Sequence, residues 1–182
     1  MTKISLILVL FLGLLGSTST RSKYITKQGE ITFFSYTTVE NIQATNNVVY
    51  SIVDLESDKI AISILMKAFE FDKSLMESHF NESYIESDLY PQATFTGDIL
   101  NYDKKFTGIQ TKIIKGEFTL RGYTQPLELK AQITNTDDTI TITGETELKV
   151  QDYHINIPPI LKPNIADNIK ISFNLIHRNH ED

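Results

Sequence analysis

Cysteine and tryptophan are both absent from the 182 residues of the chain. The missing cysteine excludes a disulfide framework, a cysteine nucleophile and a lipid attached through an N-terminal cysteine. Basic residues never gather into a run, and 17 lysines and arginines stand against 23 acidic residues, for a formal net charge of −6. This balance argues against nucleic acid and against anionic membrane surfaces as partners.

Long apolar runs are also missing, apart from Ile4 to Leu15. Lys3 precedes this run and small residues follow it at positions 17–20, an order typical of a cleaved secretory signal peptide. A run of about 12 residues is short for roughly 30 Å of hydrocarbon, so a transmembrane anchor is the weaker interpretation. We therefore predict a signal peptide over residues 1–20 and a periplasmic or secreted protein that is not an integral membrane protein.

The remainder has the length of one domain, which we predict over residues 21–178, with a polar C-terminal tail at 179–182. Most of this domain alternates apolar and polar residues with the period of a half-buried strand. The clearest case is Lys59 to Phe71, where four apolar residues fall on one face. The predicted strands are Lys23–Thr26, Glu30–Tyr36, Val48–Asp54, Lys59–Phe71, Gln92–Leu100, Gly108–Arg121, Leu127–Ile133, Ile140–Leu148 continued by Tyr153–Ile157, and Asn168–Ile176.

Turns are expected between these strands, among them Asn46-Asn47 and Glu56-Ser57-Asp58. Strands do not alternate with helices, so the predicted fold class is all-β with one short helix, an antiparallel barrel or sandwich of about eight strands. A barrel of eight strands encloses either a side-chain core or one small-molecule cavity.

Helical spacing interrupts the strands at one place only, between Phe71 and Tyr90. Asp72 or Ser74 is expected to cap this helix and Asn81 to end it. With no second helix to pack on, the helix must lie against the sheet as a lid or plug. Its apolar stripe comprises Leu75, Met76, His79 and Phe80.

Catalytic and metal-binding motifs are weak. His177-x-x-His180 with two following carboxylates is better interpreted as a solvated tail than as a metal site. His79 is better interpreted as a partly buried residue fixing the helix to the barrel than as a contact to a ligand head group. The carboxylates Glu82, Glu86 and Asp88 have the spacing of a solvated loop, and no nucleophile motif is present. We predict no enzyme activity, no metal and no cofactor.

Two motifs resemble the YceI-like family of exported proteins. The first is Met76-x-x-His79-Phe80-Asn81-Glu82-x-Tyr84-x-Glu86-Ser87-Asp88-x-Tyr90-Pro91-x-Ala93-Thr94-Phe95, in a form similar to a Bacteroidetes-type subgroup. The second is Gly116-x-Phe118-Thr119-Leu120-x-Gly122-x-Thr124-x-Pro126. The resemblance implies an extended, lipocalin-like antiparallel β-barrel whose lumen binds an isoprenoid chain or another long, lipid-like amphiphile.

The chain departs from better-known family members in two places. Their N-terminal hairpin, rich in phenylalanine and glycine, is not recognisable between Gly29 and Val53. Their arginine-aspartate pair before the helix histidine is replaced by Glu77 and Ser78. We therefore expect the helix side of the pocket, and with it the ligand, to differ from those of the better-known members.

Inward-facing apolar residues of the strands and helix are the predicted ligand-binding set. From periodicity alone they fit plain core packing better, and the resemblance favours a lined lumen. The set comprises Ile62, Ile64, Met76, His79, Phe80, Phe95, Ile99, Phe118, Leu120, Leu129, Ile142 and Phe173.

The sequence is compatible with three functions. The favoured one is an exported carrier of a long apolar ligand, and the alternative is a ligand-free envelope interaction or stress-related protein with a packed barrel. A cavity below about 300 Å³ favours the second. A hydrolase or isomerase is third, because no nucleophile and base stand at recognisable spacing. The sequence leaves open the ligand, the pathway and whether the protein is a monomer or a dimer.

Overall fold

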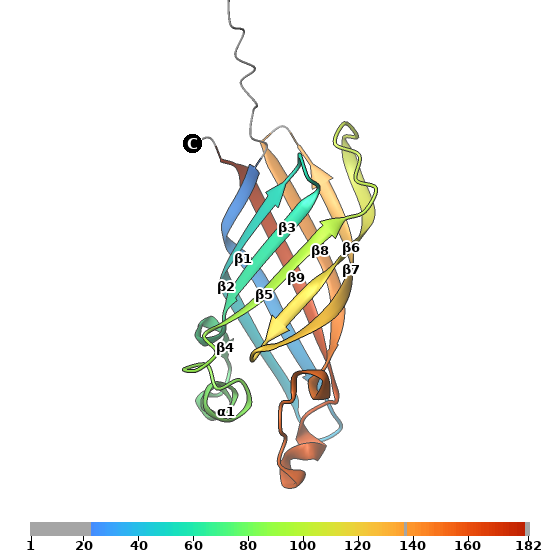
Figure 1. Cartoon of the computed structure of the whole chain (residues 1–182). Helices are drawn as coiled ribbons and strands as arrows, with labels where there is room; N and C mark the ends of the chain where they lie inside the picture. The colour runs from blue at the N-terminus through green and yellow to red at the C-terminus, as the bar shows by residue number, and fades with distance from the viewer. Residues whose placement is uncertain (1–22, 137, 181–182) are drawn as a thin grey trace, which may run out of the picture.

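The computed structural model describes residues 23–136 and 138–180, where an antiparallel sheet closes into a barrel of eight strands (Figure 1). The barrel closes because β1 pairs with β2 on one side and β9 on the other, which confirms the predicted all-β barrel. A ninth, two-residue strand, β4 (Glu70–Phe71), pairs with β2. The barrel strands are β1 (Lys23–Tyr36), β2 (Asn41–Asp54), β3 (Lys59–Leu65), β5 (Gln92–Ile99), β6 (Gly108–Leu120), β7 (Tyr123–Asn135), β8 (Thr139–Lys149) and β9 (Asn168–Asn179).

Helical turns lie at one end of the barrel (Figure 1). These are α1 (Ser74–His79), the π-helical turn η2 (Phe80–Tyr84) and the 3₁₀ turns η1 (Met66–Ala68), η3 (Val150–Tyr153) and η4 (Pro159–Asn164). Within residues 23–136 and 138–180, no helix has the length and apolar character needed to cross a membrane. The predicted signal peptide lies outside the described residues.

The predicted turn at Asn46-Asn47 is wrong, because β2 runs through it. Asn46 is fully buried, donates a hydrogen bond from Nδ2 to the Leu65 carbonyl at 2.9 Å and accepts one from the Val48 N–H. The register between β1 and β2 shifts here, opposite Gly29, so the asparagine is used in a β-bulge. The two predicted segments before it likewise form one continuous strand, β1.

The prediction that a strand continues through Tyr153–Ile157 is also wrong. The chain leaves β8 at Val150 as η3, and His154 adopts a left-handed conformation with φ of 52°. Pro159 stands at the start of η4, where its missing N–H costs nothing. The predicted strand from Lys59 also ends early, at Leu65, where η1 turns the chain toward α1.

The helix forms where it was predicted, but its predicted ends are wrong. Lys73 is the N-cap and makes no side-chain cap hydrogen bond. Asn81 does not end the helical turns, which continue to Tyr84 as η2. Asn81 instead accepts a hydrogen bond on its side-chain oxygen from the Ser87 hydroxyl at 2.6 Å, which ties η2 to the segment leading into β5.

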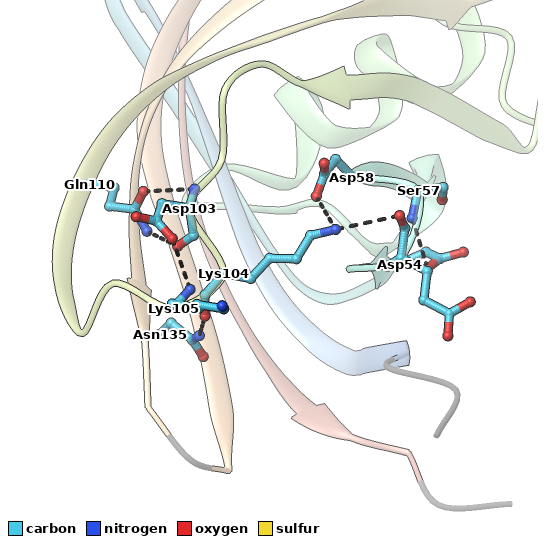
Figure 2. Close-up of polar contacts among 9 residues, drawn as sticks. Asp54, Ser57, Asp58, Asp103, Lys104, Lys105, Gln110 and Asn135 are labelled. Carbon is cyan, nitrogen blue, oxygen red and sulfur yellow. Dashed lines mark hydrogen bonds and ion pairs between the residues drawn. The ribbon is translucent and has the colours of Figure 1, made fainter. Parts of the chain in front are cut away.

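The end of the barrel away from α1 is packed solid. Side chains from all eight strands fill it, and the largest fully buried ones include Ile60, Ile114, Ile133, Ile140, Ile142 and Leu175. Outside this core, the 101–107 loop is held by polar contacts (Figure 2). Asp103 and Gln110 exchange two hydrogen bonds of 3.1 and 2.8 Å, and Lys104 pairs with Asp58 at 3.1 Å.

His177 belongs to this packed core, so the interpretation of His177-x-x-His180 as a solvated tail is wrong for His177. The apolar alternation of β9 continues inward through His177, which is fully buried, and the strand runs to Asn179. Nδ1 lies 3.1 Å from the Ile140 carbonyl and Nε2 lies 2.9 Å from the Ser51 hydroxyl. Because a carbonyl only accepts, Nδ1 carries the proton and Nε2 accepts from Ser51. Desolvation lowers the pKa of His177 to about 4, against hydrogen bonds to backbone that raise it.

Candidate ligand-binding cavity

The other end of the barrel, beside α1, is hollow. It encloses a cavity of about 450 Å³ whose walls are apolar side chains of the strands, the lid and the 150–167 segment. The barrel is thus divided along its axis into a packed half and a hollow half. This volume exceeds the roughly 300 Å³ at which small-molecule pockets begin.

The deep walls of the cavity follow from strand alternation, which points every second residue inward. Two of the wall rings pack against glycines of neighbouring strands. A Cβ on Gly116 would come within 2.8 Å of the Phe95 ring, and one on Gly144 within 2.6 Å of the Phe173 ring. The glycines therefore give these two rings a place against the wall.

Four phenylalanines join the lid to the barrel. Phe80, where α1 passes into η2, lies 5.4 Å from Phe33 of β1, 5.6 Å from Phe69 and 5.2 Å from Phe71 between ring centroids. Tilted, edge-on and offset contacts at such distances are favourable beyond the area they bury. The aromatic cluster therefore anchors the lid to the apolar wall.

Ion pairs connect the segments around the open end of the cavity, which we call its mouth. Lys73, at the start of α1, donates to the Glu40 carboxylate of the β1–β2 turn at 2.7 Å, and this bond lowers the pKa of Glu40. A hydrogen bond from Asn164 of η4 acts in the same direction. Arg121, between β6 and β7, donates both to Glu86 behind the lid and to the His154 carbonyl after η3. Each contact joins parts of the mouth that are distant in the sequence.

Most of the sequence-predicted ligand-binding residues come together in this cavity. Those that line it are Ile62, Ile64, Met76, His79, Phe80, Phe95, Phe118, Leu120, Leu129 and Phe173. Ile99 and Ile142 do not line it, because both point into the packed half of the barrel.

His79 differs from its preferred interpretation. Its side chain is exposed at the rim of the cavity, so it does not fasten the helix as a buried residue. Phe80, the next residue, performs that role through the aromatic cluster. Of the three loop carboxylates, Glu86 pairs with Arg121 and Asp88 with Lys67.

The lining residues that sequence reasoning missed include two groups with a shared character. Phe33, Phe69 and Phe71 alternate like ordinary strand residues, and only their shared aromatic character could have marked them. The second group lies partly in the predicted strand Tyr153–Ile157 and partly after Pro158-Pro159, where the prediction assigned no element. Its lining members are Ile155, Ile157, Leu161 and Ile165.

The cavity offers few groups for chemistry. Over residues 23–136 and 138–180, no group of three or more histidines, aspartates or glutamates is placed to hold a metal ion. The arrangement suits the exclusion of water from an apolar guest.

Comparisons with known proteins agree on the fold. The family model for the YceI-like domain matches residues 21–176. A polyisoprenoid binding domain from Saccharophagus degradans, implicated in plant cell wall breakdown, is 12% identical with a TM-score of 0.72, over 88% of this chain and 99% of that one. BcnA from Burkholderia cenocepacia is 15% identical with a TM-score of 0.68, over 81% and 95%.

A YCEI protein from Campylobacter jejuni is 18% identical with a TM-score of 0.54, over 71% of this chain and 78% of that one. At these identities the likeness concerns the fold alone. No curated protein sequence matches the chain.

Proposed function

Because the chain belongs to the YceI-like family, we propose that it is an exported binding or carrier protein that holds a long apolar ligand, an isoprenoid chain or a similar amphiphile, in its cavity. The observation that carries the proposal is the hollow half of the barrel, an apolar space of about 450 Å³ beneath the lid. The Saccharophagus degradans domain of the same fold, described as polyisoprenoid binding, supports the choice of ligand class.

Desolvation supplies the affinity in such a site. Each methylene group that leaves water for an apolar cavity contributes roughly 0.8 kcal/mol before the cost of immobilising the ligand. Ten buried carbons therefore contribute on the order of 8 kcal/mol. The length of the buried tail, rather than a specific polar contact, is expected to dominate affinity.

The packed-barrel alternative fits only the half of the barrel that holds Ile99 and Ile142. We propose that the protein binds its ligand without catalysing a reaction, because most of the lining residues are apolar. Export rests on the predicted signal peptide over residues 1–20, with residues 21–178 as the mature domain. N-terminal sequencing of the protein recovered from its own host tests this part.

Two neighbouring residues of β3 provide a matched test of ligand binding. Ile64 lines the cavity, whereas Leu65 points outward and is 44% exposed. In Ile64→Trp the indole occupies the space of the ligand, so we expect binding of a C20 isoprenoid alcohol to fall at least tenfold. Leu65→Trp adds the same side chain outside the barrel and is expected to bind like the wild type.

Native mass spectrometry of the protein purified from its own host gives the direct readout. We expect a lipid mass on the wild type and on Leu65→Trp, and its loss from Ile64→Trp. An apo mass for the wild type that takes up neither a polyprenol nor an isoprenoid quinone would contradict the proposal.

A further inference from the structure

Strands β7 and β8 pair along only part of their length. Their ladder ends at the pair Lys130 and Glu145, whereas β7 stays paired with β6, and β8 with β9, to the strand ends beside the cavity. Residues 123–129 of β7 and 146–149 of β8 therefore face each other across an opening in the barrel wall. We call this opening the β7–β8 window.

The sequence of β7 keeps the window open. Arg121 and Gly122 both have positive φ, 52° and 77°, as a two-residue type I′ turn requires. Counting from the hydrogen-bonded pair of Leu120 and Tyr123 that flanks this turn, every second pair along the hairpin is hydrogen-bonded. The nitrogen of Pro126 consequently faces away from β6 and toward the window, where it has no N–H to donate.

At the end of the window beside the β6–β7 turn, which we call its foot, side chains hold η3 in place. Gln125 of β7 donates from Nε2 to the Asp152 carbonyl of η3 at 3.0 Å, and Arg121 donates to the His154 carbonyl at 2.7 Å. The rings of Tyr123 and His154 lie 4.2 Å apart between centroids. These contacts hold η3 across the foot, so the window is a framed opening of fixed outline.

A second hollow of about 390 Å³ occupies the window and adjoins the cavity. Leu127, Leu148 and Tyr153 line both spaces. The rest of its lining is mostly polar and includes Glu147 and Asp152. The apolar cavity and the polar hollow thus adjoin across Leu127, Leu148 and Tyr153, an arrangement that suits an amphiphile with its tail inside and its head at the wall.

Tyr153 stands at the junction of the two spaces. The residue is 3% exposed, and its ring packs edge-on against Phe118 with centroids 5.7 Å apart. Its hydroxyl forms no hydrogen bond with any residue in the described ranges. Burial, with Asp152 nearby, raises the pKa of Tyr153 to about 12, so the hydroxyl stays protonated and able to donate.

We propose that the β7–β8 window holds the head group of the ligand, and that this head group is uncharged and carries an oxygen that accepts a hydrogen bond from the Tyr153 hydroxyl. The inference rests on the function proposed above and adds to it the chemical class of the ligand. Among the residues that line the window, Glu147 and Asp152 outnumber Lys149, and Arg121 at its foot is already paired with Glu86, so a phosphate or diphosphate head meets net negative charge there. A prenol hydroxyl or a ring carbonyl is uncharged, so this negative charge does not repel it.

Three probes with C20 isoprenoid skeletons test the proposal by titration calorimetry: geranylgeraniol, geranylgeranyl diphosphate and the head-free hydrocarbon phytane. We expect the alcohol to bind the wild type more tightly than the diphosphate. Tyr153→Phe keeps the ring against Phe118 but removes the hydrogen-bond donor. This substitution should weaken the affinity for the alcohol about three- to tenfold and leave the affinity for phytane unchanged. Tyr50→Phe, on the outer face of β2, serves as the matched control and should change neither.

The charged rim gives a second test that does not depend on a buried substitution. Replacing Glu147 and Asp152, both exposed, by lysine should raise the affinity for the diphosphate relative to the alcohol at least tenfold. An unchanged ratio would overturn the assignment of the head group to the window. A loss selective for the alcohol in Tyr84→Phe, which alters the lining contributed by η2, would overturn it as well. Failure of every probe to bind the wild type would instead refute the proposed function itself.

Discussion

Acidification below pH 6.5 should destabilise this protein through His177. Its pKa is about 4 in the folded protein, against 6.5 for the group in water. Between these two values the unfolded chain binds a proton that the folded chain does not, so stability falls as the pH drops from 6.5 to 4 and is unaffected by this group above 6.5. The difference of 2.5 pH units corresponds to about 3 kcal/mol of unfolding free energy.

The cause lies in the packed half of the barrel. The imidazole is fully buried, and both of its nitrogens already have partners that fix the neutral tautomer with the proton on Nδ1. Protonating Nε2 would oppose a second donor to the Ser51 hydroxyl and place a charge among isoleucines and leucines.

Urea unfolding of the wild type and of His177→Gln at several pH values between 4 and 7.5 measures this contribution. Glutamine retains a donor and an acceptor but does not titrate, so the wild type should lose about 3 kcal/mol more than the variant over that interval. His79→Gln, which removes an exposed histidine, should follow the wild type. Equal losses in the wild type and in His177→Gln would refute the assignment of a neutral, buried imidazole.

Two further substitutions test the lid and the walls. Phe80→Ala removes the ring shared by the aromatic cluster, and we expect a loss of about 3 kcal/mol or less, since Phe80 is only half-buried, with faster amide exchange in α1 and η2 and unchanged exchange in the packed half. Uniformly faster exchange over the barrel would argue against an independent lid. Gly116→Ala places a Cβ 2.1 Å from the Thr96 carbonyl oxygen and 2.7 Å from the Gly97 Cα, so the backbone must shift. We expect the free energy of unfolding to fall by about 1–3 kcal/mol or more, which a thermal melt would show as a lower melting temperature. An unchanged melting temperature would contradict the close approach of the strands.

Much of the barrel could be predicted because its strands follow period-two alternation without interruption. From Gln92 to Ile133 most apolar residues point inward, and the exposed exceptions are Phe106, Ile109, Ile113 and Tyr123. The errors fall where tertiary contacts override a local signal. Asn46 has the chemistry of a turn residue but satisfies its side chain inside a bulge, and His177 has the chemistry of a tail residue but finds two buried partners.

The cavity itself could not be predicted from alternation. Ile62 and Ile99 have the same character and face the same interior, yet one lines the hollow half and the other fills the packed half. The difference arises from how side chains of opposite walls meet across the barrel, which no single strand records. The family resemblance supplied what the pattern lacked.

The packed half has a consequence for ligand turnover. Because isoleucines and leucines fill the barrel beyond the cavity floor, an oily tail has no passage through that end and must leave from the hollow end, by the mouth or by the β7–β8 window. A newcomer therefore cannot push the resident molecule out from behind. Release should proceed at a rate independent of competitor concentration. A protein or membrane that receives the ligand must therefore wait until the ligand dissociates spontaneously.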